Sequence, residues 1–464
     1  MSDLLLTHGY FVYEDPKELR IMKPYPPLGM LYLCSHLRQK GFDVDVFDST
    51  FSAPQELFHI LETERASVLG IYANLMTRKN VVEITKRAKE TGWKVVVGGP
   101  EPGSYAAEYL QAGADAVVIG EGELTMEELL PALREAKVAA LERISGIAFR
   151  DEQGRVRVTK PRQQITGLDG QPWPAREAID MTRYVETWRK AHGQGSVSFI
   201  TARGCPYKCE WCSHQVFGFN HRRRDPLKVV DEVEWLCTRY RPDIFWIADD
   251  VFTIHHGWLR KYAAEMRRRG LHIPFECISR ADRLNAEVAD LLAELGCFRL
   301  WIGSESGSQR VLDNMQRGVK VEQVQSGVAL LKERGIQTGM FLMWGYEGEE
   351  LSDIEATIAH VKCTDPDIFF TTVAYPIKGT AYYERVANSL VHLKPWHETS
   401  DREVVIRGRR NVAFYSCADQ LLREEVLLAR MQREAAPVET ERELLNRVAT
   451  LRQSLYGLAK GLPV

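Results

Sequence analysis

Three cysteines, Cys205, Cys209 and Cys212, follow one another in the pattern CxxxCxxC, with Trp211 directly before the last. Iron–sulfur cubanes are usually held by four thiolates, so a compact set of three leaves one iron of a 4Fe-4S cluster without a protein ligand. An open iron can bind a substrate or a cofactor, as the open position of a catalytic zinc does. The spacing therefore predicts a 4Fe-4S cluster with one iron available for chemistry.

A structural zinc site is the alternative for these cysteines, with His214 or a distant cysteine as the fourth ligand. Zinc ligands usually come as two pairs that lie far apart in the sequence. The other cysteines form no second pair, since they stand at positions 34, 237, 277, 297, 363 and 417. The missing pair favours the iron–sulfur cluster.

The cysteine triplet resembles the signature of radical S-adenosylmethionine (SAM) enzymes. The resemblance implies that the open iron binds the methionine end of SAM, and that an electron from the cluster cleaves SAM to a 5′-deoxyadenosyl radical. It implies an external electron donor of the flavodoxin or ferredoxin type. Trp211 would shield the cluster and the adenine of SAM from water, although an aromatic residue here can also belong to the core.

The elements that must position this site begin at Ser196. Apolar strands alternate there with amphipathic helices, and six strand–helix units of this length suit a partial (β/α)6 barrel of the TIM type. Such a barrel carries its chemistry on loops at the carboxyl ends of its strands, where the cysteine triplet also lies. The strands are predicted at 196–201, 244–248, 275–278, 298–303, 339–343 and 368–373, and the helices at 228–239, 258–269, 286–295, 321–334 and 352–362.

Polar residues follow the next two predicted strands. Asp249 and Asp250 follow the second strand, and the resemblance assigns this acidic pair to the ammonium group of SAM, which needs hydrogen-bond acceptors. Turn or helix-capping acids are the alternative. After the third strand we place Glu276 and Arg280, and an arginine there can bind the carboxylate of SAM with two hydrogen bonds.

The last three strands carry further candidates for cofactor and substrate contacts. Family resemblance gives Glu305 and Ser306 to the ribose or the methionine polar groups of SAM, with capping of the next helix as the alternative. Gly345 would let adenine stack against the backbone. Tyr375, in the loop after the sixth strand, is the candidate catalytic residue and substrate contact.

The first 143 residues also alternate strands and helices, which predicts a doubly wound domain with a parallel sheet. Such domains bind ligands beyond the carboxyl ends of their strands. Glycines follow two of these strands, at 97–103 and 119–123, and would let a ligand approach the backbone at a helix N-terminus. The strands are predicted at 3–7, 44–47, 68–72, 94–97 and 116–119, and the helices at 29–40, 54–64, 81–91, 103–112 and 124–136.

The strings PYPPLGMLYL, VVVGGPEPG and VVIGEGE, in this order, resemble the cobalamin-binding domain that precedes many radical SAM barrels. The resemblance implies a cobalamin held over the sheet, with Asn74 and Met76 near the lower face of the corrin. A doubly wound scaffold that binds no corrin is the alternative. The residues implied at the nucleotide tail are Gly98, Gly99, Gly120, Glu121 and Gly122.

His8 stands where many cobalamin proteins carry the cobalt ligand of a DxHxxG loop. The aligned run from Leu6 to Phe11 keeps the histidine but lacks both the Asp and the final Gly. Without a carboxylate behind it, His8 would lack the partner that orients a metal-binding imidazole. We therefore expect His8 not to ligate cobalt.

Composition and charge exclude several classes of protein. The 464 residues include 60 basic and 63 acidic ones, a net charge of −3 that argues against general nucleic-acid binding. Unpaired cysteines, no signal peptide and no apolar run of membrane-spanning length predict a soluble, cytoplasmic protein. The basic runs 222–224 and 407–410 are expected to be solvated, or to face an anionic substrate if they lie at the barrel mouth.

The domain plan follows from these patterns. We predict a cobalamin-binding-like domain at 1–143, a linker with a hairpin at 144–195, a radical SAM barrel at 196–394 and a mainly helical C-terminal region at 395–464. The last region would cap the barrel and contact the substrate.

The predicted function is that of a cobalamin-dependent radical SAM enzyme that methylates an unactivated carbon of a small molecule through methylcobalamin. Cyclisation or rearrangement without methyl transfer is the first alternative, and a radical SAM enzyme with a vestigial cobalamin domain is the second. A radical SAM RNA methylthiolase and a non-enzymatic cluster or corrinoid sensor fit less well. The charge is near neutral, and the sequence shows no nucleic-acid-binding module.

Overall fold

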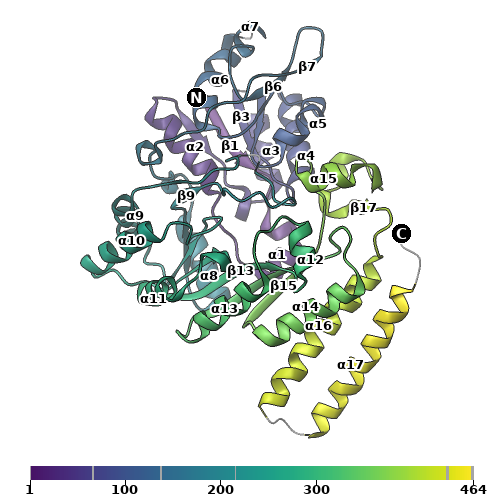
Figure 1. Cartoon of the computed structure of the whole chain (residues 1–464). Helices are drawn as coiled ribbons and strands as arrows, with labels where there is room; N and C mark the ends of the chain where they lie inside the picture. The colour runs from purple at the N-terminus through teal and green to yellow at the C-terminus, as the bar shows by residue number, and fades with distance from the viewer. Residues whose placement is uncertain (1, 65–66, 136–137, 215, 435–437, 461–464) are drawn as a thin grey trace. The chain divides into compact units, whose positions relative to one another are not determined.

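The computed structural model describes residues 2–64, 67–135, 138–214, 216–434 and 438–460 (Figure 1). Its internal contacts divide the chain into two compact units. The first unit comprises Met1–Pro206, Ser213–Ala248 and His392–Glu403, and the second comprises Tyr207–Cys212, Asp249–Val391 and Val404–Val464. Each unit is described by itself.

The first unit contains a seven-stranded sheet in the order β2-β1-β3-β4-β5-β6-β7. The first five strands are parallel, and β6 and β7 add an antiparallel hairpin at the β5 edge. The strand order reverses between β1 and β3, and doubly wound sheets bind ligands at such a point. The strands are β1 (Leu4–His8), β2 (Val44–Val46), β3 (Val68–Tyr72), β4 (Lys94–Gly98), β5 (Ala116–Val118), β6 (Ile147–Arg150) and β7 (Val156–Val158).

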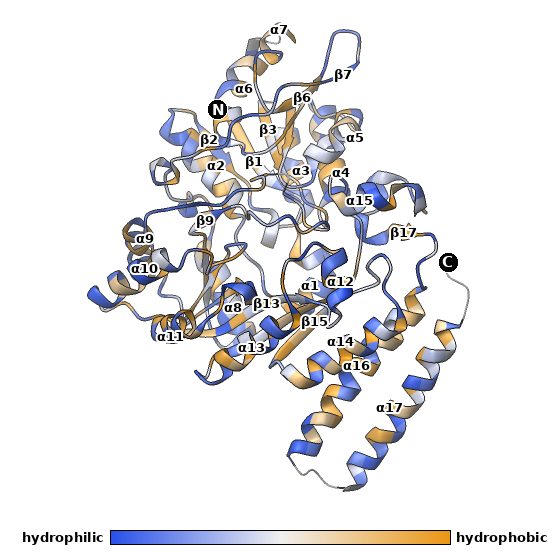
Figure 2. Ribbon diagram, viewed as in Figure 1, coloured by the Kyte–Doolittle hydropathy of each residue, from blue (hydrophilic) through white to orange (hydrophobic). Residues whose placement is uncertain are grey.

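Helices cover both faces of this sheet, which explains why its strands are apolar on both sides (Figure 2). One face, which includes Leu5 and Ile71, packs against α3 (Pro54–Thr63), α4 (Arg78–Glu90) and α5 (Ala106–Gln111). The other, which includes Leu6 and Val96, packs against α2 (Leu28–Gln39) and α6 (Glu123–Glu135). The predicted doubly wound domain is confirmed. The short helices α1 (Pro16–Ile21) and α7 (Val138–Leu141) complete this region.

The first unit also holds the beginning of the second α/β region. Strands β8 (Ser196–Phe199) and β11 (Ile244–Ile247) pair in parallel, as predicted for the first two barrel strands. Helices α8 (Met181–His192) and α9 (Pro226–Tyr240) accompany them. A two-stranded antiparallel ribbon, β9 (Ala202–Arg203) and β10 (Arg222–Arg223), brackets the chain before and after the cysteine triplet.

The second unit contributes four more parallel strands, in the order β15-β14-β13-β12. They are β12 (Phe275–Ser279), β13 (Cys297–Glu305), β14 (Gln337–Trp344) and β15 (Ile368–Val373). All six predicted barrel strands are therefore present. The helices that alternate with them are α10 (His256–Arg268), α11 (Ala286–Leu295), α12 (Gln309–Asn314), α13 (Val321–Lys332) and α14 (Leu351–Thr364).

The C-terminal region of the second unit is mainly helical, as predicted. After α15 (Ala381–Val386) and the antiparallel pair β16 (Leu390–Val391) and β17 (Val405–Ile406), α16 (Val412–Arg433) and α17 (Val438–Ala459) form the yellow helical hairpin of Figure 1. The sequence also predicts a break in the helical pattern at Pro437, and this residue lies outside the described residues.

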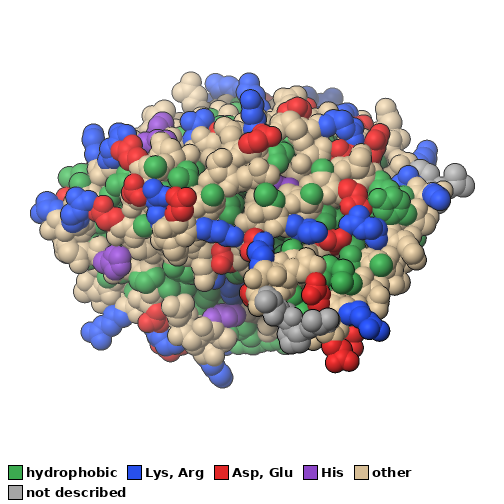
Figure 3. All heavy atoms as spheres, turned by 60° about the horizontal axis from the view of Figure 1, so that its bottom comes forward, with side chains coloured by type: hydrophobic (Ala, Val, Ile, Leu, Met, Phe, Trp, Pro, Cys, Tyr) green, Lys and Arg blue, Asp and Glu red, His purple; other side chains and the backbone are tan. Residues whose placement is uncertain are grey.

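Two surface properties bear on the predicted partners. Within the described ranges, no helix has the length and apolarity needed to cross a bilayer. The face in Figure 3 intersperses basic and acidic side chains and shows no large patch of one sign, which agrees with the near-neutral net charge.

Candidate active site

The cysteine triplet starts at a turn that requires glycine. Gly204 has φ +83°, and a Cβ on it would overlap the carbonyl oxygen of Asn220. Cys205, the first cysteine, follows this turn in the first unit and is partly buried. The glycine lets the chain turn tightly as it leaves β9.

Cys209, in the second unit, is buried between two arginines. Arg280 Nη1 donates to Cys209 Sγ at 3.8 Å, and Arg317 Nη1 donates to the same sulfur at 3.6 Å. Each guanidinium group places a positive charge next to this sulfur. Cys212 is exposed, and its backbone N–H donates to the Cys209 carbonyl at 3.1 Å.

The donor chemistry around Cys209 fits an iron–sulfur cluster. The described ranges contain no group of three His, Cys, Asp or Glu side chains already arranged around a metal, so the assignment of all three cysteines as ligands stays a prediction. A buried sulfur with two cationic donors suits an anionic cluster, whose potential depends on hydrogen bonds to its sulfurs.

Arg280 is held in place by the protein itself. Its Nε donates to Asp282 Oδ1 at 2.8 Å, its Nη2 donates to the Arg317 carbonyl at 2.9 Å, and its guanidinium lies 3.6 Å from the ring centre of Tyr207. Most of its donors are therefore engaged. The prediction that Arg280 binds the carboxylate of SAM stays untested, and these contacts give it a role behind Cys209.

Arg317 faces Glu305, which the sequence did place in the site. Arg317 Nε lies 3.8 Å from Glu305 Oε1, too far for a hydrogen bond, while its Nη2 donates to the Gly303 carbonyl at 2.9 Å. Burial raises the pKa of Glu305 although Arg317 and Arg280 oppose the rise. Glu305 also has φ +63°, which is uncommon for a residue other than glycine and clusters at functional sites.

Sequence reasoning missed Arg317. It follows the short helix α12 and precedes Gly318, and no motif marks it. The residue before it, Gln316, has a left-handed backbone with φ +49°, but this conformation is visible in the structure and not in the sequence.

Glu276 does not lie where we predicted it. It is the second residue of β12, so it lies at the amino end of the strand and not in the loop after it. Its carboxylate accepts hydrogen bonds from Trp301 Nε1 at 2.9 Å and from Arg299 Nη1 at 3.3 Å. The position was wrong because Glu276 is a polar residue inside a buried strand, where cross-strand partners satisfy it.

Ser306 has the partners expected of the capping alternative. Its hydroxyl is 3.1 Å from Thr357 Oγ1 and accepts the backbone N–H of Ser308 at 3.1 Å, just before α12.

Asp249 is buried and Asp250 is exposed, so the acidic pair does not present two equivalent carboxylates. Their predicted contacts with SAM stay untested.

Gly345 is a glycine because of a protein neighbour. It has φ +70°, and a Cβ on it would lie 2.7 Å from Cζ of Tyr415. Tyr415 thus occupies the side on which a side chain would stand.

Trp211 is partly buried and packs against the cluster of apolar side chains around Met315 and Tyr346. Tyr375 is partly buried in the loop after β15, and its predicted role stays untested.

The glycines after β4 reflect a close approach between two loops of the first unit. Gly99 has φ +121°, and a Cβ on it would overlap the carbonyl oxygen of Ala73 in the loop after β3. Gly98 ends β4, and the Ala73 N–H donates to its carbonyl at 2.8 Å. The two loops at the predicted ligand edge of the sheet are thereby fixed to each other.

Glu121 is engaged in an ion-pair network. Its carboxylate pairs with Arg203 at 2.8 Å and with Arg222 at 2.8 Å, and it accepts the Ile165 N–H at 3.0 Å. Gly120, with φ +88°, and the partly buried Gly122 shape the turn around it. The cobalamin contact predicted for these three residues stays untested, but the carboxylate has protein partners on both oxygens.

The basic run at 222–224 is neither solvated nor a free anion site. Arg222 pairs with Glu121, the Arg223 Nη2 donates to Thr201 Oγ1 at 2.9 Å, and the buried Arg224 pairs with Glu232. Arg176 pairs with the other oxygen of Glu232 at 2.7 Å. The prediction was wrong because the balancing acids lie elsewhere in the sequence. In the second basic run, Arg409 Nη1 donates to the Ala374 carbonyl.

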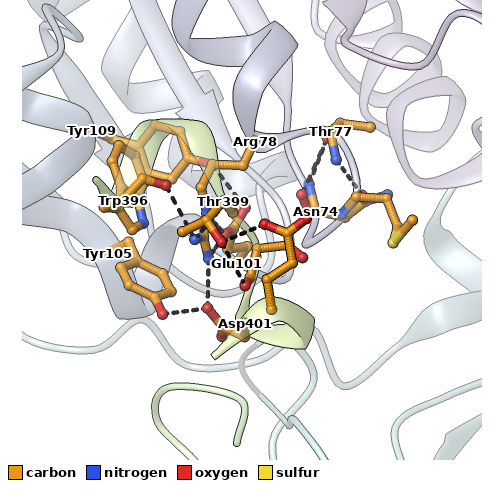
Figure 4. Close-up of polar contacts among 12 residues, drawn as sticks. Asn74, Thr77, Arg78, Glu101, Tyr105, Tyr109, Trp396, Thr399 and Asp401 are labelled. Atoms are coloured by element: carbon orange, nitrogen blue, oxygen red, sulfur yellow. Dashed lines mark hydrogen bonds and ion pairs between the residues drawn. The ribbon is translucent and has the colours of Figure 1, made fainter. Parts of the chain in front are cut away.

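The loop after β3 is an Asx turn that leads into a buried charge cluster (Figure 4). Asn74 Oδ1 accepts the N–H groups of Met76 at 2.9 Å and Thr77 at 3.2 Å, and the Met76 side chain is exposed. Arg78, the first residue of α4, pairs with Glu101 and, at 2.7 Å, with Asp401. The predicted placement of Asn74 and Met76 near a corrin stays untested.

His8 does have a carboxylate partner, contrary to our expectation. Its Nε2 lies 2.9 Å from Asp48 Oδ1, and its Nδ1 accepts the Tyr10 N–H at 3.2 Å. Both ring nitrogens are thus engaged within the protein, and the imidazole is buried in β1. The reason given for the expectation is therefore wrong, and the expectation that His8 does not ligate cobalt stays a prediction.

Comparisons with known proteins connect both regions to cofactors. Residues 20–130 match the family model described as "B12 binding domain", and residues 199–361 match the "Radical SAM superfamily". An uncharacterised methyltransferase of Pyrococcus horikoshii is 31% identical over 395 residues, covering 82% of this chain and 83% of that protein. An anaerobic magnesium-protoporphyrin IX monomethyl ester cyclase of Rubrivivax gelatinosus is 26% identical over 355 residues, covering 74% and 63%.

A solved structure shows the same fold. The radical S-adenosylmethionine methyltransferase TsrM from Kitasatospora setae, with cobalamin and a 4Fe-4S cluster bound, superposes with a TM-score of 0.69 at 21% identity. The match covers 85% of this chain and 81% of that one.

Proposed function

The chain belongs to the cobalamin-dependent radical SAM enzymes, and from that premise we propose that it methylates an unactivated carbon of a small molecule. One observation carries the proposal: a single chain matches the models for the two cofactors in this order, and its relative at 31% identity is a methyltransferase. The cofactors are SAM, a 4Fe-4S cluster and cobalamin. When bound, they supply the radical and the methyl group, while the protein binds, orients and excludes water.

Cys205, Cys209 and Cys212 hold the cluster in this proposal, and Arg280 and Arg317 donate to the Cys209 sulfur. Two guanidinium groups on one thiolate offset the negative charge that the cluster brings into a buried site.

Glu305 and Arg317 hold the amino-acid end of SAM. They face each other at 3.8 Å without a hydrogen bond, both are buried, and burial raises the pKa of Glu305. This loose pair is complementary to a zwitterion: an ammonium group restores the charge balance of Glu305, and a carboxylate binds Arg317. Asp249 and Asp250 remain the other candidates for the ammonium group.

The experiment begins with anaerobic purification, cluster reconstitution, incubation with hydroxocobalamin and desalting. The proposal expects about four irons per chain and about one cobalt, and transfer of labelled methyl from SAM to the bound cobalamin. The Cys209→Ser variant should lose the iron, whereas Cys363→Ser, at an exposed cysteine outside the triplet, should keep it. Protein that binds iron but no cobalt would refute the proposed methyltransferase activity.

Cyclisation without methyl transfer is the second candidate, because a cyclase relative matches 74% of this chain. It predicts 5′-deoxyadenosine from SAM but no labelled methyl on cobalamin. We further propose a flavodoxin- or ferredoxin-type donor. It is tested by whether reduced flavodoxin replaces dithionite in SAM cleavage.

A further inference from the structure

The sheet of the second unit has two faces of different composition. One face, which includes Leu300, Ile302 and Met340, is buried against helices such as α11 and α13. Side chains alternate along a strand, so Trp301 and Phe341 point to the opposite face. Phe370 pairs with Phe341 in the register of β14 and β15 and shares that face.

Three aromatic rings on this opposite face form what we call the aromatic stack: Trp301, Phe341 and Phe370. The ring centres of Trp301 and Phe341 lie 5.1 Å apart with planes 16° from parallel, and those of Trp301 and Phe370 lie 5.5 Å apart at 9°. The ring centres of Phe341 and Phe370 lie 6.4 Å apart, so each ring neighbours the other two, and Phe370 is the most exposed of the three, at 53%.

Two devices fix Trp301 in this position. Gly339 on the neighbouring strand leaves room for the indole, because a Cβ there would overlap the ring. The indole Nε1 donates to Glu276 Oε2 at 2.9 Å, and Arg299 lies on the same carboxylate at 3.3 Å. The stack is therefore preorganised, which lowers the entropy that a ligand loses on binding.

The aromatic stack adjoins the residues proposed to hold SAM. Gly303 pairs with Phe341 across the two strands and lies two residues beyond Trp301. The Gly303 carbonyl accepts a hydrogen bond from Arg317 at 2.9 Å, and Arg317 also donates to Cys209 Sγ at 3.6 Å. A molecule on the stack would thus lie on the same strands that carry the cofactor contacts.

We propose that the aromatic stack is part of the substrate site and that the substrate is a planar, conjugated ring molecule whose ring lies against Phe370. This inference rests on the proposed function, which requires a small molecule beside SAM. A half-exposed ring held beside two near-parallel rings favours another planar ring, because aromatic pairs gain energy beyond the area that they bury. A saturated ring or an open chain gains the buried area only.

The test compares two probes of equal skeleton and charge, planar 2-naphthoate and saturated decahydro-2-naphthoate. Their dissociation constants are measured by calorimetry on protein loaded with cluster, cobalamin and SAM. We expect the planar probe to bind about tenfold more tightly, and Phe370→Ala to weaken it about tenfold. Phe369→Ala is the matched control, because Phe369 lies on the same strand but faces Arg423 of α16 at 5.3 Å. It should leave the affinity unchanged.

Phe370→Leu keeps the apolar side chain without the ring, so it tests the stack even where Phe370→Ala fails to fold. Equal affinity for the two probes, or equal effects of the Phe369 and Phe370 substitutions, would overturn the inference. Iron, cobalt and 5′-deoxyadenosine are measured on the same preparations. If iron and cobalt are bound and 5′-deoxyadenosine is formed, a failed probe experiment refutes only the role of the aromatic stack in substrate binding. If the unsubstituted protein lacks iron, cobalt or 5′-deoxyadenosine, the proposed function is refuted.

Discussion

Replacing Arg78 by methionine should destabilise the first unit by about 3–5 kcal/mol, the usual cost of removing one partner from a buried charge cluster. Arg78, Glu101 and Asp401 are all almost completely buried. Arg78 also donates to the Thr399 carbonyl at 3.0 Å, and its guanidinium lies 4.5 Å from the ring centre of Tyr105. Methionine keeps the apolar stem but leaves two carboxylates without their cation. For a unit of this size the loss corresponds to a fall in Tm of about 6–20 °C.

The pH dependence of this loss identifies its cause. Burial raises the pKa of Glu101, and Arg78 and Tyr109 oppose that rise, so removing Arg78 raises the pKa further. A carboxyl group with a higher pKa in the folded than in the unfolded state makes folding more favourable as the pH falls. The free energy of unfolding of Arg78→Met should therefore lie closer to that of the unsubstituted protein at pH 5.5 than at pH 8.

Urea unfolding followed by near-UV circular dichroism measures both effects. Arg87→Met is the matched control, because Arg87 lies on the same helix and pairs with Glu83 on the surface, with both side chains 48% exposed. Its expected cost is about 0.5 kcal/mol or less. If Arg78→Met costs no more than Arg87→Met, or if its deficit is the same at both pH values, the reasoning about the buried cluster is wrong.

Three further substitutions test other parts of the structure. Gly99→Ala should lower the free energy of unfolding by about 1–3 kcal/mol and reduce cobalamin retention, because its Cβ would overlap the Ala73 carbonyl. Gly167→Ala, whose Cβ would stand in open space, should do neither, and equal melting curves for the two variants would contradict this. Burial raises the pKa of Glu349 to about 8, so this group makes folding less favourable as the pH rises from about 4.5 to 8. The free energy of unfolding, measured by urea titration, should fall less steeply with pH in Glu349→Gln, by up to about 1.4 kcal/mol per pH unit. An unchanged slope would show that Glu349 does not titrate in this range. Arg317→Met should lower the midpoint potential of the reconstituted cluster in an EPR-monitored titration, a tenfold shift in the redox equilibrium being about 59 mV, and Arg310→Met, on nearby α12, should not. Identical potentials for the two variants would refute the role of the sulfur contact.

The fold could be predicted from the sequence because its signals are local. The central strands β1, β3, β4 and β5 are short apolar runs, and the covering helices repeat their apolar residues at helical spacing. The six later parallel strands were predicted for the same reason, with ends that differ by a few residues at most. The cysteine triplet is equally local, since its chemistry depends on residue type and spacing within one loop.

Two predicted site residues have partners far along the chain that the sequence does not show. Glu276 has the properties of a loop acid until Trp301 and Arg299 are known to lie beside it. Glu121 has the properties of a ligand-binding turn residue until Arg203 and Arg222 engage its carboxylate. A single sequence contains no sign of these pairings, because they are fixed by the packing of separate elements.

The packing of separate elements also decides which arginines are neutralised by a carboxylate. Arg222 and Arg224 stand in a conspicuous basic run, yet buried carboxylates neutralise both of them, so they hold the structure together. Arg317 stands alone in the sequence and is only loosely paired, 3.8 Å from Glu305 and beside the sulfur of Cys209. A buried charge without a close counterion is costly unless a ligand completes it. Incomplete pairing, more than clustering in the sequence, is therefore the reason why we propose Arg317 as the arginine that contacts a cofactor.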